Sequence, residues 1–390
     1  DLGATTDSYT ISAWAKTSAS YTSPGVIVHK FTGATPQSPF ALYFDTSNRA
    51  SFDLDDGPNN PVSRTSGAMN DGKWHHYTGV RDVAADKIYL YVDGVLVDSD
   101  PDTTTATMVN DIDVSFGNSG TSYTQFDFNG QIDDVKIYNY ARTQAQIAWD
   151  YNRGAPLAYW SFDECTGATA YDSAPKADRS STRYDGTIYP VTLDNTAVGT
   201  CSSGTATEMW NDGTTGKRNA SIGVDGDDDY IQVADTANLR FDSSTQDFSL
   251  FAWIKRNTSG ATHYIISKED ADNDGYRLQF DSGNTVTCSV DAIDITSTST
   301  ITDTNWHLIG CVIDRDGNGQ VYIDAKPDGT ATAISSEAMA TTANIRLGTR
   351  AYTSTSYLDG QIDEVKIFNY ALTAQQVKDI YNEGAVYFGP

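Results

Sequence analysis

The sequence predicts an all-β protein composed of two tandem β-sandwiches, and three observations support this prediction. Short runs rich in Val, Ile, Tyr, Phe and Thr alternate apolar and polar residues and are separated by Gly, Asn, Asp and Ser, as in sandwich strands. One segment occurs twice, at residues 128–154 and 358–384, with identical residues at more than half of the aligned positions. The length of 390 residues suits two domains of ordinary size.

The overall composition argues against nucleic acid as a partner and against insertion into a membrane. The 52 Asp and Glu residues outnumber the 26 Lys and Arg residues and give a formal net charge of −26. Because such a chain is repelled by phosphate backbones, we expect no nucleic-acid partner. The sequence has no apolar run of the roughly 18 residues that a membrane span needs, and no signal peptide. It begins at Asp1 rather than Met, so we expect a processed or excised piece.

One hairpin can be placed in each repeat. Residues 88–92 and 95–97 alternate as strands, and Asp93 with Gly94 between them readily adopts the positive φ angles of a two-residue turn. The corresponding segment of the second repeat, residues 323–329, contains additional residues before the next strand. We therefore expect a longer turn there.

A short helix is predicted at the end of each repeat. Thr143 and Thr373 stand where N-caps belong, and Gly154 and Gly384 stand where the glycine after a helix belongs. These helices are expected to lie against their sandwiches and need no functional role.

The predicted domains are residues 1–154 and 155–390. The second repeat contains strand-like segments, residues 159–162 and 229–233, that have no counterpart in the first. The first domain is therefore expected to lack its N-terminal strands and to expose apolar core and unpaired strand edges. Either preceding residues of a longer chain or a strand donated by a neighbouring copy would have to cover them.

The cysteines all lie in the second repeat: Cys165, Cys201, Cys288 and Cys311. Three connectivities are possible. We favour Cys165 with Cys201 and Cys288 with Cys311, because residues 285–290 and 307–313 both alternate as strands that could pair across a sheet. Two disulfides would indicate an oxidising, extracellular compartment. The alternative is four free buried thiols.

Several segments in fixed order resemble the laminin G-like, concanavalin A-like jelly-roll domains of bacterial surface proteins. They are residues 159–164 (YWSFDE), 224–231 (VDGDDDYI), 248–254 (FSLFAWI) and 360–371 (GQIDEVKIFNYA). The resemblance covers nearly all of residues 157–384 and the first repeat from Tyr9 onward. It implies two antiparallel sheets of six or seven strands, frequently a structural Ca²⁺ at the rim, and a role in carbohydrate binding or adhesion, without specifying the ligand.

Five aspartates are candidate calcium ligands: Asp133, Asp172, Asp185, Asp229 and Asp363. In the alternating pattern Asp363 shares a face with Val365, and Asp229 shares a face with Ile231. A carboxylate at the edge of a core must be paired, hydrogen-bonded or bound to a metal, and hard oxygen ligands suit Ca²⁺. We expect the site in the second domain above all. The alternative is that these carboxylates only accept backbone N–H groups of turns.

Aromatic residues in polar loops are the candidate sugar-stacking platforms: Tyr123, Tyr352 and Tyr357. Trp14 and Trp253 recur at matched positions in apolar strands, so core packing explains them better. His75 and His307 each follow a Trp at the start of a strand and lack a partner at ligand spacing. We expect both histidines to serve packing.

No catalytic role is predicted. Hydrolases of the resembled fold use Glu-x-Asp-x-Glu on one strand, which is absent here, and the first 154 residues contain no Glu. We expect an extracellular or cell-surface binding and adhesion module whose partner is a glycan or cell-surface component. The alternatives are a structural unit of a surface appendage, filament or layer that contacts copies of itself, and, more weakly, an accessory domain of an extracellular glycosidase. An exposed aromatic patch beside Asp, Asn or Arg would favour glycan binding.

Overall fold

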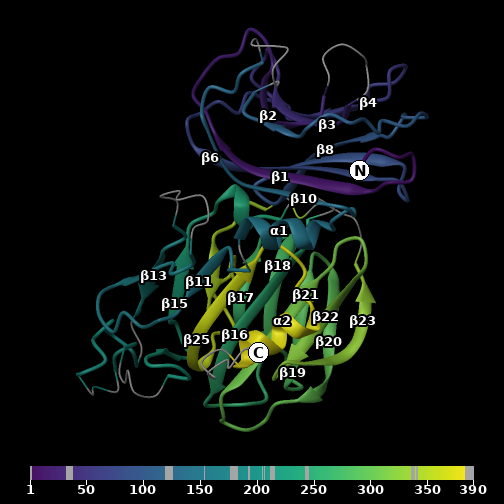
Figure 1. Cartoon of the computed structure of the whole chain (residues 1–390). Coiled ribbons are helices and arrows are strands. Elements are labelled where there is room, and N and C mark those ends of the chain that lie inside the picture. Colours follow the sequence, from purple (N-terminus) through teal and green to yellow (C-terminus); the bar gives the residue numbers. More distant parts are fainter. Residues whose placement is uncertain are drawn as a thin grey trace. The chain divides into compact units, whose positions relative to one another are not determined.

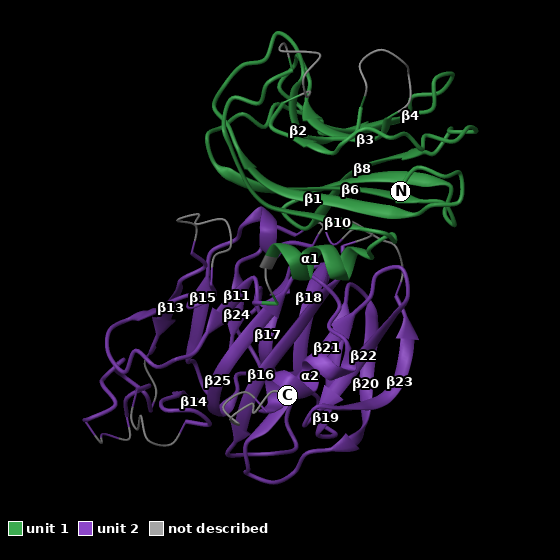
Figure 2. Ribbon diagram, in the orientation of Figure 1, with its two compact units in different colours: residues 1–154, 176–180 green, residues 155–175, 181–390 purple. Residues whose placement is uncertain are grey.

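In the computed structural model the chain forms two compact units, one built on residues 1–154 and the other on residues 155–175 and 181–390 (Figure 2). The residues that the structure describes are 2–31, 38–118, 126–152, 154–175, 183–191, 194–203, 205, 207–210, 216–241, 246–334, 339 and 341–382. Each unit is a β-sandwich and is described by itself. No helix in the described ranges is long and apolar enough to cross a membrane.

The first unit contains two antiparallel sheets of five strands each within its described residues (Figure 1). The first sheet has the order β10 (Gln131–Tyr138), β1 (Tyr9–Lys16), β6 (Trp74–Asp82), β7 (Lys87–Val92), β8 (Val95–Pro101). The second has the order β5 (Val62–Arg64), β4 (Ala50–Asp55), β3 (Ser38–Phe44), β2 (Gly25–His29), β9 (Ser115–Phe116). The facing sides bury a core that includes Ile11, Leu42, Phe52 and Tyr77.

The second unit is larger, with described sheets of seven and eight strands. The first sheet has the order β11 (Ala158–Trp160), β25 (Asp359–Phe368), β16 (Phe248–Arg256), β21 (His307–Ile313), β22 (Asn318–Ile323), β23 (Lys326–Ala333), and β14 (Ile222–Asp225) also pairs with β25. The second has the order β12 (Thr169–Ala170), β13 (Gly186–Tyr189), β15 (Tyr230–Val233), β24 (Ile345–Leu347), β17 (His263–Glu269), β18 (Gly275–Phe280), β19 (Thr285–Val290), β20 (Ile293–Thr300). A 3-10 turn, η1, spans Ala237–Leu239.

The two units share one strand plan. Strands β1 to β10 of the first unit pair in the same order as β16 to β25 of the second, with the same β-bulge where Trp14 faces Asp133 and where Trp253 faces Asp363. Strands β11 to β15 have no counterpart among the described residues of the first unit. The expectation that the first copy lacks its N-terminal strands is confirmed. The family resemblance implied sheets of six or seven strands. The described sheets have five strands each in the first unit, and seven and eight strands in the second.

Each unit ends in one short helix, α1 (Gln144–Asn152) or α2 (Ala374–Asn382), that packs on a tryptophan. Trp14 stacks on Tyr151 with ring centroids 5.6 Å apart, and Trp253 stacks on Tyr381 at 5.3 Å. The predicted N-caps are confirmed, because the hydroxyl of Thr143 accepts the N–H of Gln146 and that of Thr373 accepts the N–H of Gln376. Gly154 has a φ of +79° as predicted, and Gly384 lies outside the described residues.

The hairpin prediction holds in the first unit and is wrong in the second. Asp93 and Gly94 have φ angles of 52° and 80° and form the expected two-residue turn between β7 and β8. In the second unit Asp324 and Ala325 also have positive φ angles, 48° and 63°, and Ile323 pairs directly with Lys326. The turn is therefore not longer, because the additional residues lie in β23 beside a register shift.

Both predicted disulfides, Cys165–Cys201 and Cys288–Cys311, are present, with Cα–Cα distances of 4.9 and 6.3 Å. The second bridge differs from the expectation in one respect. Cys288 lies on β19 and Cys311 on β21, which belong to different sheets, so the bridge joins the two sheets through the core.

Candidate ligand pocket and calcium site

A pocket of about 220 Å³ lies on the outer face of the second sheet of the first unit. Alternation along the strands explains its position. Leu42, Phe44 and Phe52 point into the core, so their neighbours Tyr43 and Asp53 point away from it. The pocket is lined by Pro24, Val26, His29, Phe31, Ser38, Ala41, Tyr43, Asp53, Asp55, Asn60 and Phe126.

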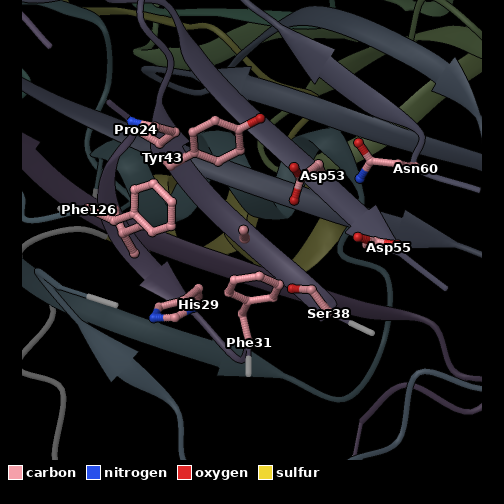
Figure 3. A pocket seen from close by; sticks show the side chains of 11 residues that line it. Pro24, His29, Phe31, Ser38, Tyr43, Asp53, Asp55, Asn60 and Phe126 are labelled. Carbon is pink, nitrogen blue, oxygen red and sulfur yellow. The ribbon is translucent and has the colours of Figure 1, made fainter. Parts of the chain in front are cut away.

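Apolar rings and polar groups occupy different sides of this pocket (Figure 3). The rings of Tyr43 and Phe126 lie on one side, whereas Asp55 and Asn60 lie on the other. The ring of Phe31 lies beside that of His29, with centroids 6.2 Å apart. The pocket therefore offers flat apolar faces together with hydrogen-bonding groups from β4 and its following loop.

Burial shifts the pKa values of three groups that line the pocket, Asp53, Tyr43 and His29. Burial raises the pKa of Asp53 to about 7, although hydrogen bonds from Tyr43 and Asn60 act in the opposite direction. Burial also raises the pKa of Tyr43 and lowers that of His29, whose Nε2 lies 3.0 Å from the carbonyl oxygen of Asn118. Near pH 7 the pocket can thus both donate and accept hydrogen bonds.

The corresponding face of the second unit has different side chains. Tyr43 and Asp53 on β3 and β4 correspond to Gln279 and Ser289 on β18 and β19, as the matching strand pairings show. Neither replacement supplies an aromatic ring or a carboxylate. The pocket chemistry of the first unit is therefore not repeated at this position.

An ion-pair cluster occupies the rest of that face in the second unit. Phe31 is replaced by Glu269, which is fully buried. Its two carboxylate oxygens contact Arg350 Nε at 2.7 Å and Arg277 Nη1 at 2.9 Å. Because both oxygens are engaged, this face is closed by charged pairs where the first unit has an aromatic pocket.

The strongest candidate for a metal site is a carboxylate group at the β14–β15 turn of the second unit. Ligand atoms of Asp225, Asp228 and Asp229 lie within 4.8 Å of one another. Asp229 is fully buried, and its Oδ2 accepts a hydrogen bond of 2.8 Å from Asn195 Nδ2. Its Oδ1 has no hydrogen-bond partner among the described residues. Burial raises the pKa of Asp229 to about 7.

The donor set of this turn suits calcium. A buried carboxylate oxygen without a partner is costly unless a proton or a cation compensates it. Asp225 is held in place because its Oδ2 accepts the N–H of Asn195 at 3.0 Å and its Oδ1 accepts the N–H of Asp227 at 3.0 Å. Three carboxylates in reach of one point are hard oxygen ligands of the kind that Ca²⁺ prefers.

A second cavity, of about 400 Å³, adjoins this turn. Its lining is polar and includes Asp225, so one side chain belongs both to the carboxylate group and to the cavity wall. The lining residues are Asp194, Asn195, Gly223, Val224, Asp225, Lys255, Asn257, Asp359, Gly360 and Gln361.

Sequence comparison places the chain in a family. A sequence profile of the concanavalin A-like lectin/glucanases superfamily, in its laminin G-like form, matches residues 1–148 and 225–378. The chain belongs to this superfamily. The family resemblance found in the sequence is thereby confirmed. No curated protein matches the sequence significantly.

Several solved structures are similar to this superfamily member at low identity. Domain 4 of an extracellular arabinanase from Geobacillus stearothermophilus, in complex with arabinotriose, is 20% identical, with a TM-score of 0.40 over 58% of this chain and 98% of that chain. Domains LG4-5 of the mouse laminin alpha1 chain are 13% identical, with a TM-score of 0.31 over 96% and 86%. The binding domain of Paraclostridial Mosquitocidal Protein 1 is 16% identical, with a TM-score of 0.37, and the chain covers 44% of it.

Two of the predicted metal ligands, Asp172 and Asp185, contact each other and serve turns. Asp172 is fully buried, and its carboxylate accepts the N–H groups of Tyr159, Ala174 and Tyr184 at 3.0–3.1 Å. The N–H of Asp172 in turn donates to Asp185 Oδ1 at 2.8 Å. This is the capping arrangement that the sequence left open as the alternative.

Asp363 and Asp133 occupy matched positions with different surroundings. Asp363 is fully buried, its Oδ2 accepts the N–H of Arg218 at 2.9 Å, and its Oδ1 has no hydrogen-bond partner within the described part of the chain. Burial, with the nearby charges of Glu364 and Asp163, raises its pKa to about 8. Asp133 is exposed, and the described residues of the first unit contain no counterpart of strands β11 to β15 and the loop with Arg218. Neither lies in the carboxylate group at the β14–β15 turn.

Two of the predicted stacking residues, Tyr352 and Tyr357, belong to the second unit and do not line the pocket. Tyr352 is exposed in the second unit, with the Arg350 guanidinium 4.5 Å from its ring centroid, and Tyr357 is half-buried. Tyr123 lies outside the described residues. The residues that the sequence analysis missed are Tyr43 and Asp53. The sequence could have indicated both residues, because each lies between two apolar residues of a strand that point into the core and must therefore point outward.

His75 and His307 do more than the packing expected of them. In the second unit Nδ1 of His307 lies 2.8 Å from Asp324 Oδ2, and Nε2 lies 3.0 Å from Asp303 Oδ1. His75 repeats this arrangement in the first unit. The hydrogen bond with Asp324, with support from Asp303, raises the pKa of His307 above its ordinary value of 6.5. Each histidine thus links a hairpin turn to the loop before its strand.

Proposed function

We propose that the chain is a non-catalytic carbohydrate-binding module that takes a sugar ring in the aromatic pocket of the first unit. The observation that carries the proposal is that the rings of Tyr43 and Phe31 line the same pocket as the hydrogen-bonding groups of Asp53 and Asn60. Sugar rings present apolar C–H faces and hydroxyl edges. Aromatic faces and polar groups in the same pocket are complementary to both.

The size and charge of the pocket define the glycan further. Its volume of about 220 Å³ is below the roughly 300–1,000 Å³ of pockets that enclose drug-sized ligands. We therefore infer recognition of one ring at the end of a glycan. Asp53 and Asp55 line the pocket of a chain with a net charge of −26, which disfavours uronic and sialic acids. Neutral and amino sugars are the proposed class.

We further propose a structural calcium ion in the second unit, held by Asp225, Asp228 and Asp229. Asp229 is fully buried, and its Oδ1 has no hydrogen-bond partner among the described residues, which supports this assignment. The ion would stabilise the β14–β15 turn and fix the wall of the polar cavity beside it. Asp363, whose Oδ1 also lacks a hydrogen-bond partner in the described part of the chain, is proposed only as a secondary calcium ligand.

The proposed setting is extracellular or at a cell surface. The disulfides Cys165–Cys201 and Cys288–Cys311 support it, since such bridges persist in oxidising compartments. A second candidate function, a structural unit that is extended by strand addition, is favoured by the outer edge of β10, with which no described strand pairs, and is developed below. No observation here favours the accessory domain of a glycosidase over these two.

A glycan array tests the binding proposal. The full chain is applied with 1 mM Ca²⁺ to neutral, amino and acidic oligosaccharides, in parallel with Tyr43→Ala and Gln279→Ala. We expect signals for neutral or amino sugars that are lost in Tyr43→Ala and kept in Gln279→Ala, the matched position of the second unit. Binding confined to acidic sugars, or signals unchanged in Tyr43→Ala, would reject the assignment.

A further inference from the structure

Strand β10 of the first unit and strand β25 of the second are matched in position but not in neighbours. β25 pairs with β16 on one edge and with β11 and β14 on the other. β10 pairs with β1, and no described strand pairs with its other edge. Accordingly Val365 and Ile367 of β25 are fully buried, whereas the matched Ile137 of β10 is 40% exposed.

In the second unit an ion pair on β25, Glu364 with Lys366, contacts β11, and β10 of the first unit carries a matching ion pair. Glu364 Oε1 accepts the hydroxyl of Tyr159 at 2.7 Å, and Lys366 Nζ lies 4.6 Å from the centroid of the Tyr159 ring. Lys366 Nζ is 3.2 Å from Glu364 Oε2. These two residues and the tyrosine form the polar part of the contact between β11 and β25.

The matched residues of β10 are Asp134 and Lys136, with Lys136 Nζ 2.8 Å from Asp134 Oδ2. The backbone is matched as well, since Asp134 has a φ of 48° and Glu364 a φ of 52°. The first unit therefore keeps a carboxylate and an ammonium group in the arrangement that holds a tyrosine in the second unit.

We propose that the outer edge of β10 is an acceptor site for an added antiparallel β-strand with the pattern of β11, a small residue followed by Tyr and Trp, supplied by another polypeptide segment. By the register of β11 on β25, the small residue would face Ile137, the Tyr would face Lys136 and the Trp would face Val135. Backbone hydrogen bonds would give affinity, and the tyrosine would contact the Asp134–Lys136 pair. This proposal is independent of the glycan pocket.

The test uses the full chain and an acetylated, amidated peptide with the sequence of residues 156–164, PLAYWSFDE. Calorimetry measures affinity, and hydrogen exchange by mass spectrometry locates the contact. We expect slower exchange in β10 and an unchanged rate in β25. Ile137→Lys should weaken binding at least tenfold, whereas Val97→Lys, at a similarly exposed site on β8 at the opposite edge of the sheet, should not.

A second peptide tests the tyrosine contact. Replacing the peptide tyrosine with alanine should weaken binding, and phenylalanine should recover only the part due to the ring. Slower exchange in β25 instead of β10, equal binding to Ile137→Lys, or no binding would overturn the proposal. A chain that is already dimeric through β10, shown by conversion to a monomer in Ile137→Lys and by indifference to the peptide, would also overturn it in favour of a second copy as the occupant.

Discussion

The ring of Phe52 lies against Gly79 in the core of the first unit, at the positions that Cys288 and Cys311 occupy in the second. A Cβ on Gly79 would come within 2.1 Å of the Phe52 ring. The strand pairings match, because Phe52 pairs with Leu42 as Cys288 pairs with its counterpart on β18. The two copies thus share one fold but differ in the contact between their two sheets at this position. The first copy has the Phe52–Gly79 contact, and the second has the Cys288–Cys311 disulfide.

The first prediction concerns this contact. Gly79→Ala should destabilise the first unit, because the added methyl group overlaps the Phe52 ring and overpacking typically costs about 1–3 kcal/mol. Denaturant unfolding monitored by intrinsic fluorescence measures the change. Gly67→Ala is the control, since no atom lies within 4 Å of a Cβ at that position. Equal stability of the two variants would show that Phe52 does not pack as described.

The second prediction concerns the bridge that replaces the contact. Cys288 and Cys311 are 23 residues apart, so loss of their disulfide should destabilise the second unit by about 3 kcal/mol. Calorimetric melting of the double variant Cys288→Ala, Cys311→Ala measures this. The melting of the first unit serves as the internal control and should stay unchanged. An unaltered second transition would contradict a structural role for the bridge.

The third prediction concerns calcium and pH together. Burial raises the pKa of Asp229 from 3.8 to about 7, so the ionised form is disfavoured in the folded state without a cation. The corresponding stability is present below about pH 4 and is lost as the pH rises through 7. In chelator the melting temperature of the second unit should therefore fall between pH 5 and pH 8. Calcium at 100 times its dissociation constant should restore about 2.7 kcal/mol at pH 8.

Two variants separate this effect from general charge repulsion. Asp229→Asn should abolish the calcium effect and reduce the pH dependence, because it removes one buried carboxylate while the part due to Asp363 remains. Asp227→Asn, at the exposed neighbour in the same turn, should leave both unchanged. If the two variants behave alike, or if calcium leaves the melting temperature unchanged at pH 8, the metal site is wrong.

The fourth prediction concerns His307. Its pKa is raised in the folded state by Asp324 and Asp303, so its charge stabilises the fold below the ordinary value of 6.5. This stability is lost as the pH rises through the raised value. The pairs are partly exposed, so we expect an effect of about 0.5–1 kcal/mol. Melting of His307→Gln at saturating calcium should show a smaller change between pH 6 and pH 9 than the unaltered chain. An identical pH dependence would exclude the contribution.

The fold was predictable because it is encoded in local pattern and in the repeat. The two matched segments and the positions of Trp14 and Trp253 indicated two copies of one sandwich. The absence of counterparts to residues 159–162 and 229–233 indicated the missing strands. The turn at Asp324 was mispredicted because residue count alone does not show whether extra residues lengthen a turn or join the next strand.

The sites were predictable only in part, because they depend on residues that are distant in sequence. Parity indicated the inward direction of Asp229, but not that Asn195 would donate to it from another loop. Parity also places Tyr43 on the outer face of its sheet. Whether that face is open depends on the residue at the end of a neighbouring strand: Phe31, just after β2, in the first unit, and the paired Glu269, the last residue of β17, in the second.

Calorimetric titration of the best oligosaccharide from the array into the full chain tests the central claim most directly. The account predicts that Tyr43→Ala weakens binding at least about tenfold, equivalent to about 1.4 kcal/mol, because the stacking face is lost. It predicts an unchanged affinity for Gln279→Ala, with both variants folded as judged by melting. Equal affinities of Tyr43→Ala and the unaltered chain would contradict it.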